Sequence, residues 1–139
     1  MSAGIFHVEN EEAMHRLAAT FAGTWSAGDT VLLEGNLGAG KTTFVRGFLA
    51  ARGWEEAVRS PTFNLMQVYD LEPPALHADL YRLKNASGIG LEDYLDTHVC
   101  LIEWPDRLGD MIDEGDCWRV EIEFAERGRI VTVTAPHPA

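Results

Sequence analysis

The chain alternates between apolar positions at helical spacing and short apolar or alternating runs, and this pattern divides it into helices and strands. Helical spacing follows Asn10, a typical N-cap residue, and predicts a helix that ends near Ala22. A second helix is expected over Lys41–Ala51, and a short third one over residues 91–95. Strands are predicted at Gly4–Val8 (an edge strand or an ordered tail), Thr30–Glu34, 63–69, 76–83, Val99–Glu103, Trp118–Phe124 and 130–134.

The composition and order of these strands predict how they assemble. Val99–Glu103 is almost wholly apolar, which is typical of a strand buried on both faces of a sheet. Strands 63–69 and 76–83 are close enough in sequence to pair as a hairpin, and the turn at 126–129 predicts another hairpin at the C-terminal end. We therefore expect one α/β domain over residues 1–139, with a mixed central sheet flanked by helices and a C-terminal β-hairpin.

A glycine-rich segment joins the apolar strand Thr30–Glu34 to the following helix. Residues 35–42 read GNLGAGKT and satisfy the pattern G-x-x-x-x-G-K-[ST], in the strand–loop–helix context that a phosphate-binding loop needs. Its glycines permit backbone conformations that turn successive N–H groups inward, and the helix adds its positive end. The expected single domain is therefore of the P-loop NTPase-like type. Lys41 is expected to reach the β- and γ-phosphates and the Thr42 hydroxyl to ligate Mg²⁺. The predicted ATP contacts here are Asn36, Leu37, Gly38, Ala39, Gly40, Lys41, Thr42 and Thr43.

Two acidic residues are candidates to complete the site, because a P-loop needs a carboxylate at the end of another buried strand. Glu103 ends the apolar strand Val99–Glu103, although a solvated strand end would read the same way. Asp79 shares a predicted strand face with His77 and Tyr81, although a surface ion pair would also explain it. His77 fits the description of a packed, hydrogen-bonded histidine at least as well as that of a functional one.

Ser60 and Thr62 flank a proline in the loop that follows the phosphate-binding helix. A loop threonine at such a place can sense the γ-phosphate and the metal ion, as in nucleotide switches. A proline-containing turn whose hydroxyls cap backbone groups explains the same residues equally well.

Composition and charge limit the partners of such a site. The formal net charge of −11 opposes strong direct binding to nucleic acid, because the phosphate backbone is also negative. No apolar run approaches the ~20 residues that span a bilayer, and the first ten residues lack a secretory pattern, so a cytoplasmic protein without membrane contact is expected. Cys100 and Cys117 form no metal-type cluster and are expected to be reduced, idle thiols.

Four motifs, taken in order, resemble the bacterial TsaE (YjeE) family, whose members are ATPases needed to form threonylcarbamoyladenosine on tRNA. The motifs are GNLGAGKTTF at 35–44, SPTF at 60–63, HADLYRL at 77–83 and IEWP at 102–105. Each motif is moderately specific alone, and the four together, at spacing similar to the family's, are specific. The resemblance covers nearly the whole chain. The chain is therefore similar to that family in sequence order as well as in motif content.

The resemblance implies a weak Mg²⁺-dependent ATPase in which Lys41, Asp79 and Glu103 act in catalysis and Thr42, Glu103 and Asp79 serve the metal ion. It also implies a switch-like loop at Ser60 and Thr62. The adenine end of ATP would lie near Asn10, Glu11 and Gly128. The implied partner is the TsaB–TsaD complex, which transfers threonylcarbamoyl to the adenosine beside the anticodon, so that tRNA is reached indirectly through these partners.

Two other functions fit the phosphate loop. A small-molecule kinase would need an acceptor pocket and usually an arginine-rich lid, and the sequence offers no such lid. A non-hydrolysing, nucleotide-gated adaptor would bind ATP without turnover even with its partners present. No arginine finger is evident either, so slow hydrolysis by the isolated chain and acceleration by a partner are expected.

Overall fold

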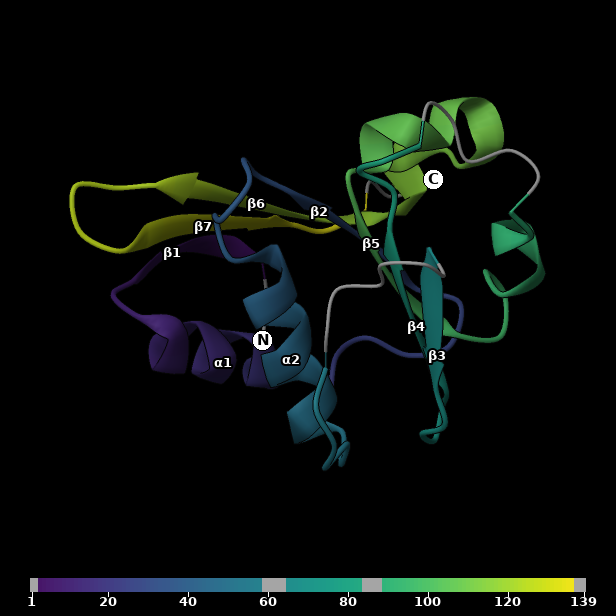
Figure 1. The fold of residues 1–139 in the computed structure, drawn as a ribbon, viewed down its shortest axis with the longest axis horizontal. Helices are drawn as coiled ribbons and strands as arrows, with labels where there is room; N and C mark the ends of the chain where they lie inside the picture. The colour runs from purple at the N-terminus through teal and green to yellow at the C-terminus, as the bar shows by residue number, and fades with distance from the viewer. Residues whose placement is uncertain (1–2, 59–64, 84–88, 137–139) are drawn as a thin grey trace.

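The chain is built on one seven-stranded sheet. The computed structural model describes residues 3–58, 65–83 and 89–136. The strands lie in the order β1-β7-β6-β2-β5-β4-β3 (Figure 1). The strands are β1 (Gly4–Val8), β2 (Thr30–Glu34), β3 (Met66–Tyr69), β4 (Ala75–Asp79), β5 (Val99–Glu103), β6 (Trp118–Phe124) and β7 (Arg129–Thr134). The helices are α1 (Glu11–Thr20), α2 (Lys41–Ala51) and the 3₁₀ helices η1 (Leu91–Asp93), η2 (Pro105–Met111) and η3 (Glu114–Asp116).

The sheet is mixed, with a parallel centre and antiparallel edges. Strand β2 pairs in parallel with β5 and β6, and β5 pairs in parallel with β4. The hairpins β6–β7 and β3–β4 and the pairing of β1 with β7 are antiparallel. An α/β fold with a mixed sheet and a C-terminal hairpin is thereby confirmed. All residues of β5 are buried, as its apolar sequence predicts.

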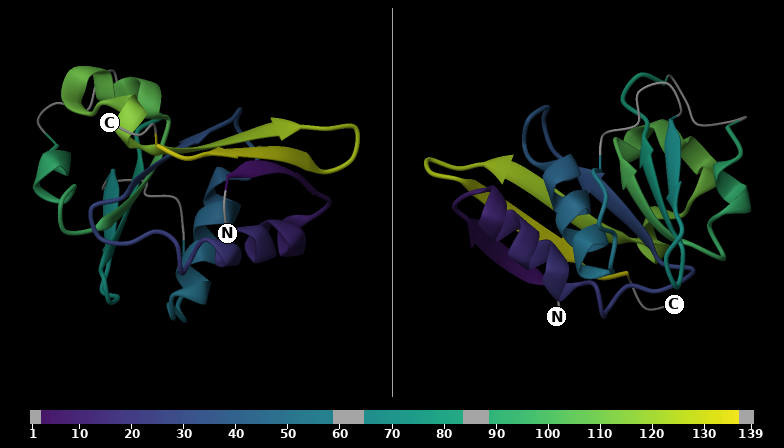
Figure 2. Two further views of the ribbon diagram at one scale, coloured as in Figure 1. Left: turned by 180° about the vertical axis from the view of Figure 1, so that it is seen from behind. Right: turned by 60° about the horizontal axis from the view of Figure 1, so that its bottom comes forward.

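The two faces of the sheet carry different layers. Helices α1 and α2 pack together on one face of the sheet. The 3₁₀ helices lie on the opposite face, beside β4 and β5 (Figure 2). Gly47 permits the close helix contact, since a Cβ there would lie 2.6 Å from the His15 Cα. Successive side chains of β2 and β5 point to opposite faces of the sheet. Leu33 and Leu101 therefore pack in the core beneath α1 and α2, whereas Leu32 and Ile102 pack in a second core on the opposite face.

Several predicted boundaries are wrong by a few residues. Helix α1 ends at Thr20, because the N–H groups of Phe21 and Ala22 bond three residues back in a tightened turn. That turn carries Phe21 into the core, where it stacks on Trp25 at a centroid distance of 4.8 Å. Strand β3 starts only at Met66, and the predicted helix over 91–95 is the single 3₁₀ turn of η1.

Strand β4 ends at Asp79, four residues before the predicted end. The Asp79 carboxylate accepts a hydrogen bond from the Tyr81 N–H at 3.1 Å, which forms an Asx turn and breaks the strand. His77 and Asp79 therefore share a strand face, but Tyr81 does not belong to it.

The two cysteines are buried and unpaired with each other. Burial raises the pKa of the Cys100 thiol to about 12 and that of the Cys117 thiol to about 11. The expectation of idle thiols agrees with this burial. Within the described ranges, none of the helices has the length and apolar character that crossing a bilayer requires.

Candidate nucleotide-binding site

The glycine-rich loop lies between β2, at the centre of the sheet, and the start of α2 (Figure 1). Gly35, Gly38 and Gly40 all have positive φ, as the phosphate-loop prediction requires. Gly40 stands at the N-cap of α2 with φ 118° and no side-chain cap. The first N–H groups of the helix are therefore left for another acceptor, and an anion satisfies them well.

Lys41, the first residue of α2, is folded back over this loop. Its ammonium donates to the Gly35 carbonyl and, at 3.3 Å, to the Asn36 carbonyl. It lies 4.1 Å from the centroid of the Trp104 ring. Burial lowers the pKa of Lys41, and the negative charges of Glu103 and Asp79 partly oppose that shift. The loop thus holds a desolvated positive charge between main-chain carbonyls and two acids.

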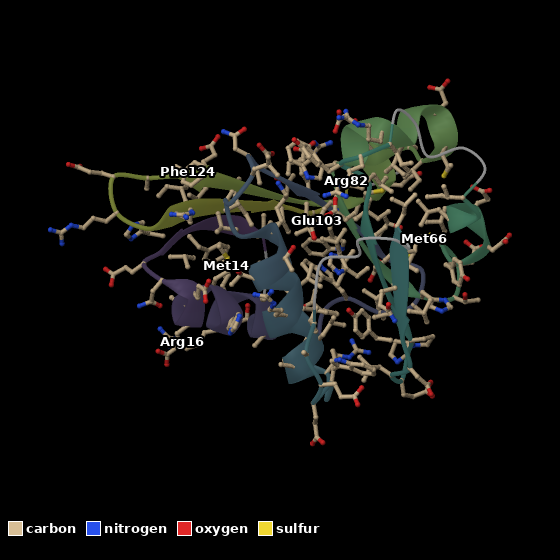
Figure 3. All side chains as sticks on the ribbon, viewed as in Figure 1. Met14, Arg16, Met66, Arg82, Glu103 and Phe124 are labelled. Atoms are coloured by element: carbon tan, nitrogen blue, oxygen red, sulfur yellow. The ribbon has the colours of Figure 1, made fainter. Side chains whose placement is uncertain are left out.

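Asp79 and Glu103 meet at the carboxyl ends of β4 and β5, where they are partners in register. The Thr42 hydroxyl donates to the Glu103 Oε2 at 3.0 Å, which ties the second residue of α2 to the end of β5. Glu103 is only 3% exposed, so it is not the solvated strand end that its sequence also allowed. It lies centrally, beside the start of α2 (Figure 3).

These oxygen donors fit a magnesium ion. Mg²⁺ prefers hard oxygen ligands and is usually held by one or two carboxylates together with substrate phosphates and water. Within the described residues, no group of three or more His, Cys, Asp or Glu side chains could hold a metal ion alone. A site made from Thr42 and one or two acids would therefore need the nucleotide's phosphates to complete it.

His77 is a further polar residue in contact with Glu103. It is completely buried on β4, and its Nε2 lies 2.5 Å from the same Glu103 Oε2 that accepts from Thr42. Its Nδ1 is buried and has no hydrogen-bond partner among the described residues. The sequence placed His77 on the face shared with Asp79, but gave no sign that it contacts Glu103.

Trp104 is a site residue that the sequence reasoning did not single out. It has φ 61° and ψ 58°, a left-handed conformation that is strained for a bulky residue. Its ring packs on that of Tyr81 at a centroid distance of 4.7 Å and covers the Lys41 ammonium. The signal available in the sequence was the Trp-Pro pair that directly follows the buried acid.

A pocket of about 270 Å³ opens beside the loop. Its lining includes the predicted adenine-end residues Asn10, Glu11 and Gly128 together with the loop residues Gly38, Ala39, Gly40 and Thr43. Asn36, Leu37 and Thr42 do not line it, and Leu37 is 60% exposed. The Asn10 side chain accepts from the Ala13 N–H at 2.8 Å and so also caps α1, as the sequence predicted.

Arg129, at the start of β7, is a second residue that sequence reasoning missed. Its guanidinium donates to the Ala39 carbonyl at 3.0 Å and to the Gly38 carbonyl at 3.3 Å, and it lies 4.5 Å from the Phe124 ring centroid. In a trans peptide the carbonyl and the next N–H point in opposite directions. Because Arg129 binds the Ala39 carbonyl, the Gly40 N–H of the same peptide points away from the Arg129 guanidinium.

The predicted switch residues Ser60 and Thr62 lie outside the described residues, so their roles stay predictions.

Together, the fold and this site define an α/β protein with a phosphate-loop motif between its central strand and a helix, faced by the acids of two neighbouring strands. The family model described as "Threonylcarbamoyl adenosine biosynthesis protein TsaE" matches residues 8–131. The chain belongs to the TsaE family, whose proteins serve threonylcarbamoyladenosine biosynthesis on tRNA.

Individual relatives agree with this assignment. The tRNA threonylcarbamoyladenosine biosynthesis protein TsaE of Bacillus subtilis is 38% identical over 133 residues, which cover 91% of this chain and 80% of that protein. The TsaE protein of Streptomyces coelicolor is 36% identical, covering 87% of this chain and 89% of its own. A crystal structure of Bacillus subtilis YdiB superimposes with a TM-score of 0.84 at 31% identity, over 97% of this chain and 86% of that one.

Proposed function

We propose that the chain is the ATP-binding and ATP-hydrolysing subunit required for threonylcarbamoyladenosine modification of tRNA. The observation that carries this proposal is the convergence of Lys41, Thr42 and Glu103 at the open N-terminus of α2. Family membership supplies the biological process, and the geometry supplies the chemistry that the chain would contribute.

Each residue has a distinct role in the proposed site. The N–H groups at the start of α2 would bind phosphate oxygens, and the Lys41 ammonium would exchange the Gly35 and Asn36 carbonyls for the β- and γ-phosphates. Thr42 and Glu103, with Asp79 beside them, would hold Mg²⁺, which neutralises charge on the phosphates when bound. Asp79 or Glu103 would orient the attacking water for in-line displacement.

The pocket bounded by Asn10, Glu11 and Gly128 would take the base end of ATP. Its floor is the same loop that would bind the phosphates, so one nucleotide can occupy both places. Val8 and Met14 also line this pocket, together with Gly38 and Ala39 of the loop. An apolar lining beside a few polar groups suits a planar heterocycle.

Partners would complete this function. The chain would act in the cytoplasm with the TsaB–TsaD complex, and tRNA would be bound mainly by those partners, since a net charge of −11 opposes direct binding. Within the described residues, Arg129 lies against the loop, but its guanidinium is occupied by the Gly38 and Ala39 carbonyls. It is therefore not placed to serve as an arginine finger on the γ-phosphate. Isolated hydrolysis should therefore be slow, and the partners should accelerate it.

The deciding experiment measures ATP hydrolysis by the chain alone and with the cognate TsaB–TsaD complex, for the parent, a Glu103→Ala variant and a Glu92→Ala control. Glu92 is an exposed acid on η1 and should behave as the parent. Slow turnover that rises with the complex and falls at least 100-fold in Glu103→Ala supports the proposal, a magnitude typical of losing a group that acts in the transition state.

Three other results would contradict the proposal in different ways. Turnover and nucleotide affinity indifferent to the complex would leave an ATPase with another biological role. Transfer of the γ-phosphate to a metabolite would indicate a kinase. Nucleotide binding without hydrolysis, even with the complex present, would indicate a nucleotide-gated adaptor.

A further inference from the structure

We infer that His77 is a positioning residue that fixes the Glu103 carboxylate for the metal ion bound with the nucleotide. This inference rests on the proposed function. Its basis is that one carboxylate oxygen, Glu103 Oε2, is shared by two side chains from different elements. The Thr42 hydroxyl of α2 approaches it at 3.0 Å and the His77 Nε2 of β4 at 2.5 Å.

The surroundings of His77 decide which nitrogen carries the proton. Nε2 faces an acid, whereas Nδ1 is buried without a partner among the described residues. A proton on Nδ1 would place an unsatisfied donor in the core, which costs about 1–3 kcal/mol. With the proton on Nε2, Nδ1 is, among the described residues, an unpaired acceptor and not an unpaired donor, and Nε2 donates to the carboxylate instead of facing it with a lone pair.

Two donors on one oxygen constrain the carboxylate in a way that one cannot. The hydrogen bond from Thr42 ties the Glu103 carboxylate to α2, and the hydrogen bond from His77 ties it to β4. The carboxylate is therefore held in a fixed position relative to both the helix and the sheet. Glu103 itself has three rotatable side-chain bonds that a single contact would not hold. Among the described residues, both side chains that contact this carboxylate do so at Oε2, so Oε1 is the oxygen that this arrangement leaves for other ligands.

His77 would not touch the nucleotide. It lies two residues before Asp79 on β4, its partner in register is Leu101, and it is fully buried behind the carboxylate. Its effect would reach the metal ion only through Glu103, as outer-shell partners of metal ligands do. Loss of such a partner typically costs 10–100-fold in metal affinity or activity.

Three substitutions at His77 separate the hydrogen bond from packing. His77→Gln places an amide N–H near the Nε2 position and keeps the donor. His77→Asn is one methylene shorter than His77→Gln, so its amide cannot reach Oε2. His77→Leu fills the space without a donor. Leu76→Val is the matched control, because it shortens the adjacent buried residue, whose side chain packs in the other core.

The readout is binding of a non-hydrolysable ATP analogue at fixed concentration while Mg²⁺ is titrated, with the same analogue measured in EDTA. We expect His77→Leu and His77→Asn to raise the Mg²⁺ midpoint by about 10–100-fold. His77→Gln and Leu76→Val should stay within about threefold of the parent, and the affinity in EDTA should be unchanged in all of them. Either His77→Leu or His77→Asn suffices if the other fails to fold.

Several results would overturn the inference. An unchanged Mg²⁺ midpoint in a folded His77→Leu or His77→Asn variant would show that Glu103 needs no support from His77. An equal shift in Leu76→Val would reduce the role of His77 to packing. A folded His77→Gln that behaves as His77→Leu would show that the Nε2 donor is not what matters. If the parent itself shows no Mg²⁺ dependence, the proposed function fails before His77 is tested.

Discussion

The two ends of the candidate site are built in different ways. The phosphate end consists of functional side chains: a lysine that donates to loop carbonyls, a half-buried aspartate, and a threonine hydroxyl and a buried histidine that both contact one buried glutamate. The base end is largely backbone, with the loop after β6 packed against the connection between β1 and α1. A Cβ on Gly128 would lie 2.1 Å from the Val8 carbonyl oxygen, so these two segments are in direct contact.

This difference implies that the two ends respond to mutation differently. At the phosphate end, a polar substitution should change ligand binding while the fold tolerates it, because the buried charges there are costly to the folded chain. At the base end, a small added volume should change the fold first and binding as a consequence. Each substitution below can be judged by whether stability or affinity moves more.

The largest expected effect is that of Lys41→Gln on nucleotide binding. Removing one partner of a buried charge interaction costs about 2–5 kcal/mol, so affinity for Mg·ATP should fall roughly 30-fold to several thousand-fold. The free energy of unfolding of the nucleotide-free protein should stay the same or rise, because burial makes the charged ammonium less favourable in the fold than in the unfolded chain. Calorimetric titration and urea unfolding measure the two quantities.

The pH dependence of unfolding supplies the control for Lys41. Since folding lowers the pKa of Lys41 below 10.5, the unfolded chain binds this proton more tightly. The parent's free energy of unfolding should therefore rise with pH from the folded pKa up to 10.5 relative to that of Lys41→Gln. A parallel pH profile, or a Lys41→Gln variant that is clearly less stable, would contradict the account of a desolvated lysine.

Gly128→Ala should have the opposite balance. Its positive φ of 69° and the clash with Val8 should destabilise the fold by about 1–3 kcal/mol or more. Affinity for ATP should fall, whereas that for inorganic tripolyphosphate, which does not need the base pocket, should not. Gly23→Ala is the control, since a Cβ there meets nothing within 4 Å. Equal losses for ATP and tripolyphosphate would show that the base does not lie in this pocket.

Arg129→Gln should have the smallest effect on ligand affinity, because Arg129 lies between the two ends of the site, where it contacts the loop and lines the pocket. It removes the bonds to the Gly38 and Ala39 carbonyls, each worth about 1 kcal/mol, so affinity for both ATP and tripolyphosphate should weaken several-fold. Arg129→Lys keeps the charge but not the fork, and should weaken binding nearly as much if orientation of the loop is what matters. Full recovery in Arg129→Lys would instead indicate a general electrostatic role.

The phosphate end could be predicted from sequence because its chemistry admits few residue types at fixed spacing. The loop glycines, Lys41 and Thr42 are consecutive, so local sequence contains their relation. Glu103 was found because a buried strand that ends on an acid is unusual. The sheet itself followed from apolar runs, and the errors were confined to ends such as that of β4, where the Asx turn at Asp79 depends on one side-chain contact.

Other contacts could not be predicted because they join positions far apart in sequence. Arg129 is 90 residues from the Ala39 carbonyl that it binds, and His77 is 26 residues from Glu103. The register of β4 against β5, which sets the latter contact, depends on packing of both cores and not on either strand alone. Trp104 likewise required knowledge of a backbone conformation that its neighbours impose.

The position of β7 between β1 and β6 has a consequence for how the chain is made. Of the seven strands in the described residues, β1 is synthesised first, yet its partner in the sheet is β7, the last of the seven. Until β7 has been made, β1 has no strand beside it in this sheet, and the wall that Gly128 and Arg129 give to the pocket beside the loop does not exist. A nascent chain that lacks β7 therefore cannot form the complete pocket, although the elements that carry Lys41, Thr42 and Glu103 have already been made.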